Sequence, residues 1–115
     1  MLAKHLSIKQ QRDIRYVYNK GRSSSSKDLR IKYCKNKLSY SRFVFVVSNK
    51  ISKKAVVRNK IRRRLKAIIY HNLDKFLGNY DIIISVRQTP INRSYQEIEA
   101  ELKSVLRRGR LIKDI

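Results

Sequence analysis

Apolar residues recur every three or four positions in three segments of the chain, and this spacing predicts three amphipathic helices. The first begins at a capping box in residues 7–10 and runs to Lys20, with Gly21 as its stop. The second covers residues 52–76, and the third opens at a capping box in residues 94–97. The residues expected on the core-facing sides are, in chain order, Ile14, Val17 and Tyr18; Val57, Ile61, Leu65 and Ile68; and Ile98, Leu102, Val105 and Leu106.

Strand patterns fill the space between these helices. Residues 28–35 alternate, with Leu29, Ile31 and Tyr33 on one face and polar residues on the other. Residues 40–48 are rich in β-branched and aromatic side chains and predict a second, more buried strand, and the short connection favours an antiparallel hairpin. Residues 82–86 predict a third, central strand.

The remaining polar segments are expected to be irregular. The serine-rich residues 22–27 are interpreted as a connector, and residues 109–115 as a frayed tail. The element order is then αββαβα in one domain over residues 1–115, which indicates an α+β sandwich of helices on a small sheet.

Charge is what narrows the function. The chain carries 29 Lys+Arg against 8 Asp+Glu, a formal net charge of +21, and such a field attracts polyanions. Nucleic acid is favoured over an anionic membrane surface, because a membrane-surface helix uses Trp, Phe and Leu, and here Trp is absent and Phe occurs three times.

The cysteine count and the hydropathy of the chain argue against disulfide-bonded, zinc-binding, membrane-spanning and secreted proteins. The single Cys34 cannot form an internal disulfide, and no Cys/His cluster has zinc spacing. No apolar run reaches the roughly 20 residues of a membrane span, and residues 1–9 lack the apolar stretch of a secretory signal. We therefore expect a cytoplasmic protein with no membrane partner.

The long helix concentrates positive charge. Nine of the 17 residues in 50–66 are basic and none is acidic. A phosphate-lined partner explains this, because adjacent cations repel one another on a free helix. A merely solvated face is the alternative, although such faces normally mix both signs. The residues on the arc opposite the apolar stripe are Arg58, Asn59, Arg62, Arg63 and Lys66.

Three segments in the same order carry a resemblance to a known family. Residues 55–63, Ala-Val-Val-Arg-Asn-Lys-Ile-Arg-Arg, resemble the Arg-Asn-Arg motif helix of the bacterial ribonuclease P protein family. Residues 14–21 are similar to the family's first helix, with Ile14 and Tyr18 where the family prefers Phe, and residues 80–87 are similar to its last strand. Asn49, Lys66 and Ala67 also depart from the family's usual residues.

The resemblance implies a fold and a function. The fold is an αβββαβα two-layer sandwich with a three- to four-stranded sheet and a left-handed βαβ crossover, similar to ribosomal protein S5 domain 2. The implied function is to bind the catalytic RNA of ribonuclease P and the 5′ leader of precursor tRNA, and so to assist endonucleolytic removal of the leader.

The resemblance also implies two surfaces. The residues expected to face the catalytic RNA are Lys50, Lys53, Lys54, Arg58, Asn59, Arg62, Arg63 and Lys66. A groove between the first helix and the sheet is expected to take the leader, with Ile14, Tyr18 and Tyr33 as its floor and Lys27 at its rim. Core packing is the alternative for Ile14, Tyr18 and Tyr33.

No protein-based catalytic or metal site is evident from the residues. His5 and His71 have no identifiable carboxylate partner, and the acids are scattered along the chain. The catalytic groups are therefore expected on the RNA and the magnesium that it requires, with no cofactor held by this chain. A structural ribosomal protein and a free-standing nuclease are the competing interpretations.

Overall fold

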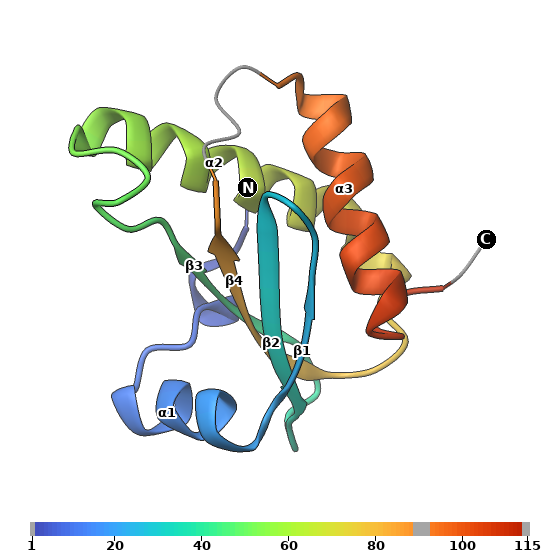
Figure 1. The fold of residues 1–115 in the computed structure, drawn as a ribbon. Helices are drawn as coiled ribbons and strands as arrows, with labels where there is room; N and C mark the ends of the chain where they lie inside the picture. Colours follow the sequence, from blue (N-terminus) through green and yellow to red (C-terminus); the bar gives the residue numbers. More distant parts are fainter. Residues whose placement is uncertain (1, 89–92, 114–115) are drawn as a thin grey trace.

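The computed structural model describes residues 2–88 and 93–113 of the chain, and these residues form a four-stranded sheet with helices on both faces (Figure 1). The elements are η1 (Lys4–Leu6), α1 (Gln11–Lys20), β1 (Arg22–Ser25), β2 (Leu29–Lys35), β3 (Arg42–Val46), α2 (Ala55–Asn72), η2 (Leu73–Lys75), β4 (Tyr80–Val86) and α3 (Tyr95–Arg108).

The sheet order is β1-β2-β4-β3, which corrects two predictions. The expected connector at residues 22–27 contains an edge strand, because β1 pairs antiparallel with β2. The expected hairpin between β2 and β3 is also wrong. β4 lies between them, antiparallel to β2 and parallel to β3, so α2 is the crossover of a β3–α2–β4 unit.

β4 takes the central place because its side chains are buried on both faces. Ile82 and Ile84 pack into the main core with α2 and α3, whereas Ile83 points to the opposite face, on which α1 packs against β2 and β4. Val17 of α1 is fully buried on that side. The result is a layer of α2 and α3 on one face and α1 alone on the other (Figure 1).

The three predicted helices are present, with shorter bounds. The expected capping box of α1 is wrong, because Ser7 forms a bridge with Phe43 of β3 and α1 starts after Gln10 without a side-chain cap. α2 ends at Asn72, where the backbone leaves the helical conformation with φ −121° and ψ 10°, and the side-chain amide of Asn72 donates to the Ile68 carbonyl over 2.7 Å. No described helix is long and apolar enough to span a membrane.

The predicted cap of α3 is confirmed, and the expected frayed tail is wrong for residues 109–113. The Ser94 hydroxyl accepts from the Glu97 N–H over 3.1 Å, and the Glu97 carboxylate accepts from the Ser94 N–H over 3.0 Å. Beyond α3, Leu111 and Ile112 are buried, and the Leu111 carbonyl accepts a hydrogen bond from the backbone of the segment after η2. Apolar side chains therefore hold this end of the chain against the core.

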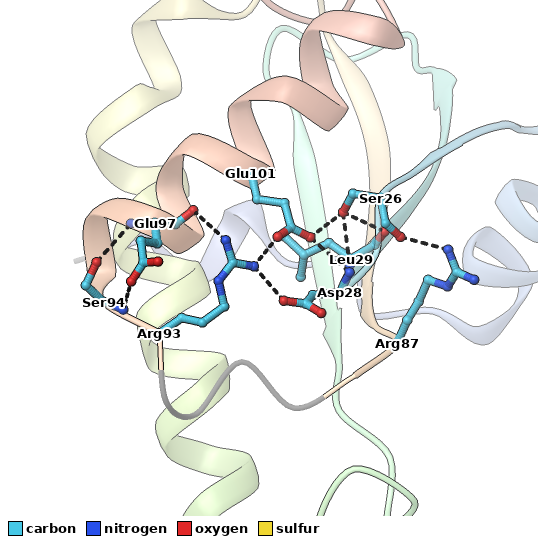
Figure 2. Close-up of polar contacts among 8 residues, drawn as sticks. All are labelled: Ser26, Asp28, Leu29, Arg87, Arg93, Ser94, Glu97 and Glu101. Atoms are coloured by element: carbon cyan, nitrogen blue, oxygen red, sulfur yellow. Dashed lines mark hydrogen bonds and ion pairs between the residues drawn. The ribbon is translucent and has the colours of Figure 1, made fainter.

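A polar network fastens the β1–β2 turn to α3 (Figure 2). The Arg93 guanidinium binds Asp28 over 2.5 Å and also binds Glu101, which accepts from the Ser26 hydroxyl and the Asp28 N–H. Burial alone would raise the pKa of Glu101, but these hydrogen bonds outweigh burial and hold its pKa below the ordinary value. Ionised Glu101 thus stabilises the packing of α3 on the sheet.

Candidate nucleic-acid interface

Six acidic residues in the described part of the chain form structural contacts away from the basic arc of α2. Asp13 and Asp81 bind Arg42, while Asp28 and Glu101 bind Arg93. Glu97 caps α3, and Glu99 accepts a hydrogen bond from Asn72 at the end of α2. Within the described part of the chain, no ion pair involves a basic side chain of α2, so the positive field of this helix is uncompensated.

The predicted arc comes together around one open hollow of about 480 Å³. Its lining residues, called here the α2 surface, are Val56, Asn59, Arg62, Arg63 and Lys66. The Arg62 guanidinium donates to the Asn59 side-chain oxygen over 2.5 Å, which fixes the guanidinium beside the amide. Three cations around a hollow can contact successive phosphates, and Asn59 adds a neutral group for a base edge or a 2′-hydroxyl.

Arg58, the fifth residue of the predicted arc, is placed differently. Its side chain is half-buried and donates to the Ser52 carbonyl over 2.9 Å, and it does not line the hollow. This bond braces the segment before α2, which presents Lys50, Lys53 and Lys54 to solvent. Arg58 therefore stabilises the segment that carries Lys50, Lys53 and Lys54, and it adds its own charge.

A second hollow of about 510 Å³ adjoins the α2 surface and shares Arg63 and Lys66 with it. Tyr70 lines this hollow with an exposed ring, which meets the His71 ring edge to face with centroids 5.4 Å apart. Sequence reasoning missed Tyr70 and the exposed Val56. The available signal for Tyr70 was its position four residues after Lys66, which places both on one side of a helix.

The four residues predicted for the leader groove are only partly brought together. Ile14 and Tyr18 lie on one side of α1, where Ile14 is half-buried and the Tyr18 side chain is 44% exposed. The Lys32 ammonium group of β2 donates to the Tyr18 carbonyl over 3.0 Å. The prediction that Tyr33 faces the groove beside α1 is wrong. Successive side chains of β2 point to opposite faces of the sheet, and Tyr33 packs against the core on the face away from α1. Lys27 is exposed in the turn between β1 and β2, at the opposite end of β1 from α1.

The histidines take no part in a cluster of ligands. His71 is exposed, and His5 packs edge to face on Tyr40 with centroids 5.1 Å apart. Among the residues that the structure describes, no three His, Cys, Asp or Glu side chains gather where they could hold a metal ion.

Comparisons with known proteins agree with this geometry. The family model described as Ribonuclease P matches residues 2–110. The ribonuclease P protein component of Clostridium botulinum is 35% identical over 107 residues, covering 92% of this chain and 96% of the relative, and that of Alkaliphilus metalliredigens is 36% identical over 105 residues, covering 91% and 94%. The solved Staphylococcus aureus RNase P protein superposes with a TM-score of 0.83 at 28% identity, covering 94% of this chain and 98% of that one. The shared architecture confirms the predicted fold class, a small α+β sandwich with a four-stranded sheet.

Proposed function

Because this chain belongs to the ribonuclease P protein family, we propose that its α2 surface binds the catalytic RNA of ribonuclease P and that the complex removes the 5′ leader of precursor tRNA. Family membership makes the chain the protein component of an endoribonuclease with an RNA partner. The proposal adds which surface meets the RNA and which substrate the complex cuts.

One observation carries the proposal. Arg62, Arg63 and Lys66 line one hollow, and none of the ion pairs among the described residues neutralises them, because the paired carboxylates bind Arg12, Arg42 and Arg93. Like charges held together without a counter-charge repel one another. Binding of RNA phosphates between these cations neutralises their charge and releases counterions from the RNA.

We further propose that the groups that cleave the phosphodiester belong to the RNA and its magnesium. The most buried carboxylates among the described residues support this division of labour, because Asp28 and Asp81 are each bound to a guanidinium. The protein's part is then to lower the electrostatic repulsion between the two RNAs and to position the substrate.

Reconstitution tests the proposed function. The purified protein is mixed with a bacterial ribonuclease P RNA and a precursor tRNA at a magnesium concentration too low for the RNA alone. Leader removal only when both components are present is the expected result. Cutting by the protein alone would identify a free-standing nuclease, and failure to restore specific cutting would fit a structural ribosomal protein.

For the leader itself, we propose that α1 contributes Tyr18, with Ile14 beside it. The ring of Tyr18 is partly exposed next to half-buried Ile14, and Lys32 reaches the same end of α1 with its ammonium group. An unpaired base stacked on a tyrosine ring contributes about 1–3 kcal/mol, which corresponds to roughly 5- to 150-fold in affinity.

Tyr18→Ala is therefore expected to reduce the affinity ratio of precursor to mature tRNA in the reconstituted enzyme by at least fivefold. Tyr18→Phe keeps the ring and should keep most of the ratio. Tyr16→Ala is the matched control, because Tyr16 is more exposed and lies on the other side of the same helix. An equal effect of Tyr16→Ala and Tyr18→Ala would reject Tyr18 as a specific base contact.

A further inference from the structure

A recess at one end of the sheet brings together basic and aromatic residues from five parts of the fold. It has a volume of about 420 Å³, within the range of small-ligand sites, and it shares no lining residue with the α2 surface. We call it the terminal recess. Its main lining residues are Lys20, Arg22, Tyr33, Lys35, Tyr80 and Arg110.

The charge of the terminal recess is of one sign. Four of its side chains are cations, and no carboxylate is among the described residues that line it. Asp81, which pairs across the strands with Cys34 of the recess wall, is bound to Arg42 over 2.6 Å. The recess thus has the property that marks the α2 surface, which is a group of cations without a counter-charge.

Two tyrosines give the recess aromatic surface. The rings of Tyr33 and Tyr80 meet edge to face, with centroids 6.3 Å apart and an interplanar angle of 83°. Both side chains are half-buried, so each ring is held in place while part of it stays accessible. Cations beside a fixed aromatic ring are the usual combination for an unpaired nucleotide.

The backbone places Arg110 at the recess in an unfavourable conformation. α3 ends in a Schellman motif, with the Leu111 N–H donating to the Leu106 carbonyl over 3.0 Å and the Arg110 N–H to the Arg107 carbonyl over 2.9 Å. The motif requires a left-handed residue at Arg110, whose φ is 63°, and glycine is the residue that adopts this conformation without strain.

The glycine stands one position earlier for a different reason. Gly109 has a φ of −78°, which any residue can adopt, but a Cβ there would lie 3.0–3.2 Å from the Tyr33 ring. The chain therefore keeps an arginine at the position where the backbone favours glycine. Residues in unfavourable backbone conformations are enriched at ligand-binding sites, so the conformation of Arg110 agrees with a role for its side chain in the recess.

We propose that the terminal recess is a second RNA-binding site, which takes one unpaired nucleotide with its phosphate at Arg110 and the neighbouring cations and its base against the tyrosine pair. The proposal rests on the RNA-binding function proposed above, but it concerns a different face of the molecule. A large RNA bound at α2 would then be held at two separated points.

The single cysteine of the chain gives a local test, because Cys34 lines the terminal recess. The full chain carrying Arg62→Ala, Arg63→Ala and Lys66→Ala, which weakens binding at α2, is incubated with an eight-nucleotide oligoadenylate. Alkylation of Cys34 by iodoacetamide is followed by mass spectrometry. Arg110→Gly is compared with Arg108→Ala, which removes the same charge from an exposed position outside the recess.

The oligonucleotide is expected to slow alkylation of Cys34 at least fivefold in the Arg108→Ala protein and less than twofold in the Arg110→Gly protein. Arg110→Gly should melt no lower than the control, because glycine relaxes the left-handed residue. Equal protection in both proteins overturns the proposal, as does equal protection by inorganic phosphate at the same concentration. Neither result would change the salt dependence of RNA binding at α2, so failure here is distinct from failure of the proposed function.

Discussion

Removing cations from the α2 surface is expected to flatten the salt dependence of RNA binding in roughly equal steps. Each phosphate contact contributes about 0.7–0.9 to the slope of log affinity against log salt. The hollow is lined by three cations, so Arg62→Ala should lower the slope by about 0.8, and the triple variant with Arg63→Ala and Lys66→Ala by about 2–2.7.

The assay is equilibrium binding to a ribonuclease P RNA between about 50 and 200 mM monovalent salt. Over this fourfold range each lost contact changes the ratio of the two affinities by about threefold. Lys60→Ala is the matched control, because Lys60 is exposed on the same helix but does not line the hollow. Its slope should change by much less than that of Arg62→Ala.

Two results would refute this reasoning. If Lys60→Ala flattens the slope as much as Arg62→Ala, the RNA responds to the diffuse charge of the chain and not to the hollow. If the triple variant keeps the wild-type slope, the RNA contacts lie on another surface.

Three further predictions concern the fold that positions these surfaces. Leu65→Ala should cost about 2–5 kcal/mol in urea melts because Leu65 is 1% exposed, while the adjacent Lys66→Ala leaves the midpoint unchanged; a loss below about 1 kcal/mol would contradict the helix phase. Gly21→Ala should lower stability by about 1–3 kcal/mol, because a Cβ would lie 2.4 Å from the Val17 carbonyl oxygen, whereas Gly78→Ala makes only ordinary contacts and serves as the control. Glu101→Gln should destabilise the protein at neutral pH, because the lowered pKa of Glu101 means that its ionised form stabilises the fold above about pH 4.5. The difference in unfolding free energy between wild type and variant should therefore shrink as the pH falls below that value, and a difference that stays constant down to pH 3 would contradict the stabilising role of the network in Figure 2.

Local patterns predicted the helices well and the strand pairing poorly. The apolar spacing of α2 and α3 and the cap at Ser94 are local properties, and the structure confirms them. β1 was missed because its serines do not alternate, and Ser24 contributes by a hydroxyl bond to the Val105 carbonyl over 2.9 Å. The partner of β3 depends on where α2 returns the chain, which no local pattern records.

The same distinction holds for the candidate sites. Helical spacing was sufficient to group Asn59, Arg62 and Lys66, because one helix carries all of them. Tyr33 was assigned to the wrong face because alternation places it with Ile31 but does not say which face α1 covers. The terminal recess was not predictable, because its walls come from segments that meet only in the folded chain.

The rate of leader removal at saturating protein tests the central claim most directly. Precursor tRNA and a ribonuclease P RNA are held at low magnesium, and wild-type protein and the Arg62, Arg63 and Lys66 triple alanine variant are titrated in. If these side chains bind RNA and carry no catalytic group, the variant needs a higher concentration but reaches the wild-type rate at saturation. A saturating rate that falls by tenfold or more, with the variant fully bound to the RNA, would contradict this account of the α2 surface.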